Sequence, residues 1–164
     1  MSALVVSVFL LSGCIRQLPE TDGHMALANL VKRGYARDKE YIRNQEGSEI
    51  RIWGYVDHAN ISLSEGTIEN KPLDWTILKN DGGSYFDLKA RLNDDAGESI
   101  RIRIIGSEEQ YKEVFKKLRD MRTVNPQTPA LVTGIMRTFE APTNTGLLIG
   151  VSIDLESPEN IKFN

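Results

Sequence analysis

Several kinds of residue on which enzymes rely are scarce in this chain of 164 residues. It has one cysteine, Cys14, and two histidines, His24 and His58. It contains no Gly-x-Ser-x-Gly elbow, no phosphate-binding loop and no His-Glu-x-x-His pair. Its net charge of -3 lacks the strongly basic balance of most nucleic-acid binders, without excluding a local basic patch. These absences predict a protein that is not an enzyme and that holds no metal or other cofactor.

The two histidines give little support to a metal site. His58 follows Asp57 at the end of a predicted strand, and this pair could hold a metal only with further ligands brought by the fold. A histidine that anchors a loop or lies at the surface is the favoured interpretation. An enzyme, such as a metal-dependent hydrolase, is therefore the least favoured functional class.

An apolar run over residues 3–11 opens the chain, and it is well short of the roughly 20 residues that span a bilayer as a helix. It ends in Leu11-Ser-Gly-Cys14, which resembles the lipobox of bacterial lipoproteins. The resemblance implies a signal peptide over residues 1–13, a lipid on Cys14 and a tether over residues 14–23. A buried structural thiol behind an ordinary signal peptide is the alternative.

The lipobox resemblance also implies a cellular location. Two or more acyl chains anchor a protein stably, so the membrane becomes a partner through lipidated Cys14. Ile15 stands where an aspartate favours inner-membrane retention in enterobacterial lipoproteins. The expected location is the bacterial cell envelope, anchored by lipid in the outer membrane and facing the periplasm.

The hydrophobic pattern of the remaining chain predicts a helical segment followed by strands. Thr21 or Asp22 is the expected cap of the helical segment 24–46, which Gly34 should divide or bend. Ser107-Glu-Glu-Gln110 is a capping box that begins a second helix. The strands, with a turn at Glu140–Gly146 before the last, are predicted at Glu49–Asp57, at Trp75–Lys79 with Ser84–Leu92, at Ser99–Ile105, at Ala130–Phe139 and at Leu147–Leu155.

This order of elements resembles the oligonucleotide/oligosaccharide-binding (OB) fold. The resemblance implies an all-β domain over residues 47–164, a five-stranded Greek-key barrel with accessory helices and one helix between strands three and four. Gly47–Asp57 looks like the opening strand of small OB-fold proteins of the bacterial envelope. Similar lipoproteins are commonly described as nucleic-acid-binding, a description that rests largely on the fold, and fold alone does not give function.

The first three strands of an OB barrel are neighbours, so their outward residues should share one face. These residues mix aromatic rings with cations, which suits single-stranded nucleic acid, an anionic polymer or an acidic protein. A solvated barrel exterior, with Trp53 packed under the N-terminal helix, is the alternative. The candidate ligand-binding residues are Arg51, Trp53, Tyr55, Tyr85, Lys89, Arg91, Arg101 and Arg103.

Two loops adjoin this face in an OB barrel, over residues 58–74 and 140–146, and the first is long for a hairpin. Its candidate ligand-binding residues are His58, Asn60, Ser62 and Ser64, although a merely solvated loop explains them equally well. The sequence thus predicts a non-enzymatic, lipid-anchored binding module whose ligand is an envelope protein or a polymer. Single-stranded nucleic-acid binding on the same face is the alternative.

Overall fold

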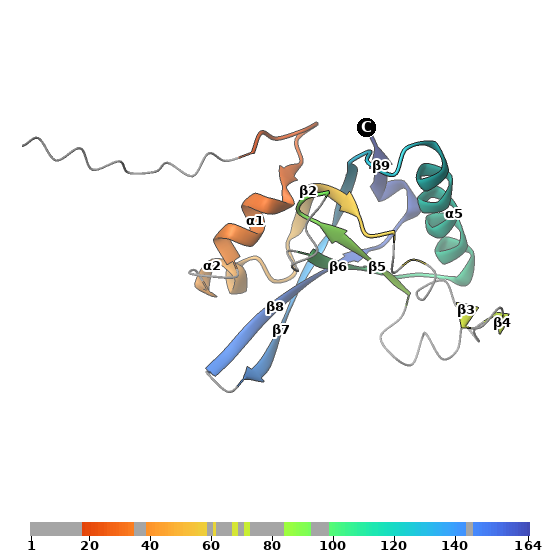
Figure 1. Ribbon diagram of the computed structural model, residues 1–164. Coiled ribbons are helices and arrows are strands. Elements are labelled where there is room, and N and C mark those ends of the chain that lie inside the picture. Colours follow the sequence, from red (N-terminus) through yellow and green to blue (C-terminus); the bar gives the residue numbers. More distant parts are fainter. Residues whose placement is uncertain are drawn as a thin grey trace, which may run out of the picture.

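The computed structural model (Figure 1) describes residues 18–34, 39–58, 61, 67–68, 71–72, 84–92, 99–143 and 146–164. The predicted signal peptide, Cys14 and the predicted strand at Trp75–Lys79 lie outside these residues. Among the described residues, no helix is long and apolar enough to cross a membrane.

Five strands form a closed barrel, which confirms the predicted OB fold. They are β2 (Glu49–Val56), β5 (Tyr85–Lys89), β6 (Ser99–Ile104), β7 (Ala130–Thr143) and β8 (Gly146–Leu155). Their order is β2-β5-β6-β8-β7, and pairing of β2 with β7 closes the ring. All neighbours are antiparallel except β6 and β8, which run parallel because α5 (Glu108–Val124) and β7 intervene between them in the chain.

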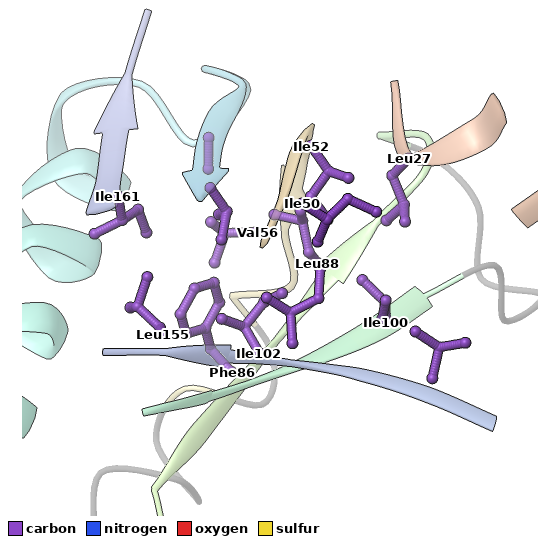
Figure 2. Packing of buried hydrophobic residues seen from close by; sticks show 14 of the residues in the cluster. Leu27, Ile50, Ile52, Val56, Phe86, Leu88, Ile100, Ile102, Leu155 and Ile161 are labelled. Atoms are coloured by element: carbon purple, nitrogen blue, oxygen red, sulfur yellow. The ribbon is translucent and has the colours of Figure 1, made fainter. Parts of the chain in front are cut away.

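The alternating pattern of each strand places its apolar residues inside the barrel. Along β2 the even-numbered positions are buried, and the same alternation holds in β5 and β6. Burying one such apolar side chain stabilises the folded state by about 1.5–3 kcal/mol, so these rows contribute much of the stability of the core. Figure 2 shows this cluster, in which the labelled side chains are Leu27, Ile50, Ile52, Val56, Phe86, Leu88, Ile100, Ile102, Leu155 and Ile161.

The helix α5 begins where the capping box was predicted. Ser107 Oγ accepts from the Gln110 backbone N–H, and the Gln110 side chain accepts from the Ser107 N–H at 2.8 Å. One face of the helix is buried by Tyr111, Val114, Phe115 and Leu118. After β8 the chain makes a short 3₁₀ turn, η1 (Pro158–Asn160), and then β9 (Ile161–Phe163), which pairs with the start of β7.

The N-terminal helices lie on the other side of the barrel strands from α5 (Figure 1). The predicted division near Gly34 is confirmed, because α1 (Leu27–Gly34) ends there and α2 (Lys39–Asn44) follows. The predicted cap at Thr21 or Asp22 is wrong. These residues belong to a tight turn in which Thr21 and His24 exchange two backbone hydrogen bonds, and β1 (Met25–Ala26) separates the turn from α1.

The hairpin of β7 and β8 differs from the prediction in length. The expected turn began at Glu140, but β7 continues to Thr143 and pairs with β8 as far as Gly146. The β7–β8 hairpin extends beyond the barrel (Figure 1), and in this part the two strands pair with each other. The strand predicted to reach Leu92 is also shorter, because β5 ends at Lys89, and Leu92 is exposed. Two short strands, β3 (Thr67–Ile68) and β4 (Lys71–Pro72), pair within the long first loop.

Candidate ligand-binding face

The strand register divides the predicted face into two groups. Tyr55 lies opposite Lys89, whereas Tyr85 lies opposite Arg103 at the far end of β5. The first half of β2, with Arg51 and Trp53, pairs with β7 and not with β5. Arg91 is exposed beyond the end of β5.

Trp53 is partly covered by the N-terminal residues 18–26, which we call the strap. Strand β1 of the strap runs parallel beside Ile52 and Trp53. The indole Nε1 donates to the carbonyl oxygen of Pro19 at 3.1 Å, and the ring meets Tyr55 edge-on with centroids 6.1 Å apart. Trp53 therefore has a packing role, although the strap covers it where the sequence suggested the N-terminal helix.

A buried asparagine fastens the strap to the domain. Asn29 in α1 accepts from the Leu18 backbone N–H at 3.1 Å and donates to the Leu18 carbonyl oxygen at 2.8 Å. Residues 18–23, which the sequence assigned to the tether, thus lie against the barrel domain.

The second group of candidates lies on β5 and β6, where an arginine stacks on a tyrosine. The Arg101 guanidinium carbon lies 3.8 Å from the centroid of the Tyr85 ring. The Arg101 Nε is 3.5 Å from Asp87 Oδ1 on the neighbouring strand. The Tyr85 ring and the Asp87 carboxylate together position the guanidinium, while about half of the Arg101 side chain, 51%, stays exposed.

Most cations of the candidate set have a carboxylate close by. Lys89 Nζ lies 3.3 Å from Asp57, and Arg51 lies 3.2 Å from Glu49. The first pair is largely shielded from solvent and the second is exposed, so the second contributes little to stability. The outer face is therefore charge-balanced and is not a basic stripe.

Two residues of this surface were missed by the sequence analysis, Asp154 on β8 and Arg137 on β7. Asp154 is 8% exposed in its side chain. Arg137 Nε donates to its Oδ2 at 2.9 Å, and Arg103 Nε lies 2.9 Å from its Oδ1 without the alignment of a hydrogen bond. The hydrogen bond to Asp154 raises the pKa of Arg137 above its ordinary value, with further support from the charges of Asp154 and Glu46. The sequence signal that could have indicated this pair is Asp154 itself, a single acidic residue in the otherwise largely apolar strand β8.

His58, which was predicted to reach a ligand from the first loop, lies half-buried at the end of β2. Burial lowers its pKa below the ordinary value, and the charge of Arg122 lowers it further. Asp57 and a hydrogen bond with the Pro126 backbone oppose this shift. His58 therefore lies near the segment that follows α5. The other candidates of this loop, Asn60, Ser62 and Ser64, lie outside the described residues.

The described residues do not form a metal-binding group. Within residues 18–34, 39–58, 84–92, 99–143 and 146–164 and the short described pieces between them, no three His, Cys, Asp or Glu side chains could hold a metal ion together. A small hollow lies beside β7, β9 and η1. It is lined by His24, Leu131, Thr133, Glu159, Asn160 and Lys162.

The closed five-stranded barrel, with α5 between its third and fourth strands, defines the class of this chain as an OB-fold protein with accessory helices. No protein-family model and no curated protein matches the chain. Among solved structures it is similar to an aspartyl-tRNA synthetase from Entamoeba histolytica, with 13% identity and a TM-score of 0.36 over 90% of this chain. The chain spans 24% of that synthetase's length.

Proposed function

We propose that this chain is a non-enzymatic binding module whose ligand, a protein or a polymer, lies on the outer face of β5 and β6 and on the adjoining loops. The observation that carries the proposal is the Arg101–Tyr85 stack, held in place by Asp87. A stacked, carboxylate-oriented guanidinium has lost its conformational freedom before a ligand arrives, so binding does not have to restrict it.

The charge balance of the face favours a ligand of mixed polarity over a polyanion. Lys89 is engaged by Asp57, and Arg103 by Asp154, so neither is a free counterion for a phosphate. A protein segment or a glycan can instead place a flat group on Tyr85 and acceptors on Arg101. Trp53, which would extend a stacking platform, is partly covered by the strap.

Single-stranded nucleic acid is the second candidate, and the exposed Arg101–Tyr85 stack is the observation in its favour. The salt dependence of binding distinguishes the nucleic-acid candidate from a protein or polymer ligand. A nucleic-acid ligand predicts that affinity for a short oligothymidylate falls steeply between about 20 and 200 mM salt, and that Arg101→Ala reduces the slope. No binding at low salt would remove this candidate.

The protein or polymer ligand is tested by capture from an envelope extract with the full chain. The expected result is a ligand retained by the wild type, lost with Tyr85→Ala and Arg101→Ala, and kept by Arg119→Ala. Arg119 is an exposed arginine of α5 and serves as the control for loss of one positive charge. Equal retention by all variants would place the ligand elsewhere and contradict the proposal.

The lipid anchor belongs to the same proposal. Leu11-Ser-Gly-Cys14 supports attachment to the bacterial envelope membrane, with the domain on the periplasmic side of the outer membrane. Cys14→Ser should move the protein from the membrane fraction to the soluble fraction. Unchanged fractionation of this variant would contradict the anchor without affecting the ligand face.

A further inference from the structure

The strap begins very close to the proposed lipid anchor. Four peptide bonds separate Cys14 from Leu18, the first residue of the strap. Consecutive Cα atoms lie about 3.8 Å apart across a trans peptide, so covalent geometry alone keeps the Cα atoms of Cys14 and Leu18 within about 15 Å of each other. The position of Leu18 on the domain therefore decides which side of the domain can face the lipid.

The strap is held to the domain along its length. The buried side chain of Asn29 binds both the backbone N–H and the carbonyl oxygen of Leu18, and the indole of Trp53 binds the residue after it. Further along, β1 pairs with β2, and His24 Nε2 lies 3.2 Å from Thr133 Oγ1 of β7. Leu18 is thus fixed at the surface of the domain, and the strap adds no length to the connection.

This connection is short compared with the domain. A folded chain of this length has a diameter of roughly 35–40 Å, and a polar protein surface is costly to bury in hydrocarbon. A point held within about 15 Å of the lipidated residue must therefore lie in the half of the domain nearer to the membrane.

The surface around Leu18 forms one end of the molecule. The strap and the C-terminus lie close together there, and the Asn164 side chain donates to the Asp22 carboxylate at 3.3 Å. Leu18 itself presents an apolar side chain that is 39% exposed. The β7–β8 hairpin reaches the opposite end of the molecule (Figure 1).

We propose that the strap is the surface with which the domain contacts the phospholipid headgroups, so that the β7–β8 hairpin is directed away from the membrane. The proposal rests on the proposed function, because it requires the lipid on Cys14. Glu20 and Asp22 are exposed in the strap, so attraction to anionic lipid does not hold it there. The short connection does, and the orientation is therefore independent of salt.

The test is methyl nuclear magnetic resonance of the full-length, lipidated protein in phospholipid nanodiscs that contain a gadolinium-chelating headgroup lipid. The paramagnetic ion speeds the relaxation of a methyl group more strongly the closer the two are. Leu18 and Met25 report on the strap, and Leu147 and Leu148 report on the hairpin. The enhancement should be at least about threefold larger for the strap methyls, because the two ends are separated by much of the domain's diameter.

A variant with a longer connection is the matched control. An insertion of about twenty Gly and Ser residues between Gln17 and Leu18 leaves the strap contacts in place and lengthens the connection by roughly 25 Å. The difference between strap and hairpin methyls should then fall below about twofold, since the longer connection lets the domain turn. An unchanged difference in this variant, or a difference in the parent protein that disappears at high salt, would overturn the proposal.

Failure of the anchor and failure of the orientation give different results. Mass spectrometry of the protein extracted from membranes detects acyl groups on Cys14 directly. A protein without these groups would refute the anchor and the orientation together. An acylated protein whose hairpin methyls relax as fast as those of the strap, or faster, would refute the orientation alone.

Discussion

Asp154→Asn isolates the charge of the buried acid beside Arg103 and Arg137, because the amide has nearly the shape of the carboxylate. The change removes the charge that Arg137 and Arg103 approach at 2.9 Å. A hydrogen bond to a charged group contributes about 1.5–3 kcal/mol. Both arginines are roughly two-fifths exposed and regain water when the charge is lost, so we expect the lower part of that range, about 2 kcal/mol.

The assay is equilibrium unfolding in urea, in which the midpoint should fall while the slope stays constant. Glu49→Gln is the matched control, because it removes an acid paired with Arg51 that is 57% exposed. It should cost less than about 0.5 kcal/mol. A double-mutant cycle of Asp154→Asn with Arg137→Gln should give a coupling of about 1 kcal/mol. Equal costs for Asp154→Asn and Glu49→Gln, or no coupling, would refute the assigned role of Asp154.

Three further variants test other parts of the fold by the same unfolding assay. The pKa of His58 is lowered in the folded state, so the free energy of unfolding should be highest above about pH 6.5 and should decrease below it. His58→Asn should make this decrease smaller. An unchanged pH dependence in the variant would contradict the role assigned to His58. Ser107→Ala should cost about 1 kcal/mol by removing the cap of α5, and no loss would show that the cap is dispensable. Gly54→Ala should cost about 1–3 kcal/mol, because its Cβ would lie 2.7 Å from the Lys89 carbonyl oxygen; a neutral result would mean that the strands separate freely there.

The barrel was predictable because each strand carries its own periodic signal. Ile100 and Ile102 alternate with Arg101 and Ser99, and burying one side of a strand requires this pattern whatever its neighbours are. The same reasoning failed at Glu140–Thr143. Pro142 is a residue type common in turns, but here it lies opposite Leu147 in the β7–β8 hairpin, where pairing between the two strands sets the structure.

The candidate site was less predictable because alternation gives the face of a strand but not its register. Alternation places Arg101 and Tyr85 on the outer side of their strands, while the separation of Trp53 from Tyr85 depends on which residues of β2 pair with β7 and which with β5. The bond between Trp53 and Pro19 joins residues 34 positions apart. Arg137 and Asp154 are 17 positions apart, and their pairing follows from the register of the β7–β8 hairpin.

The parallel pairing of β6 with β8 has a consequence for the order in which the chain can fold. β6 finds its second neighbour only after α5, β7 and most of β8 have been synthesised. Until then the isoleucine faces of β2 and β6 have no closed interior, and β6 keeps a free edge that can pair with another chain, whereas β2 pairs with β7 one strand earlier. Completion of the barrel during synthesis must therefore wait for Leu155, and chaperone binding to nascent chains should persist until that residue emerges from the ribosome.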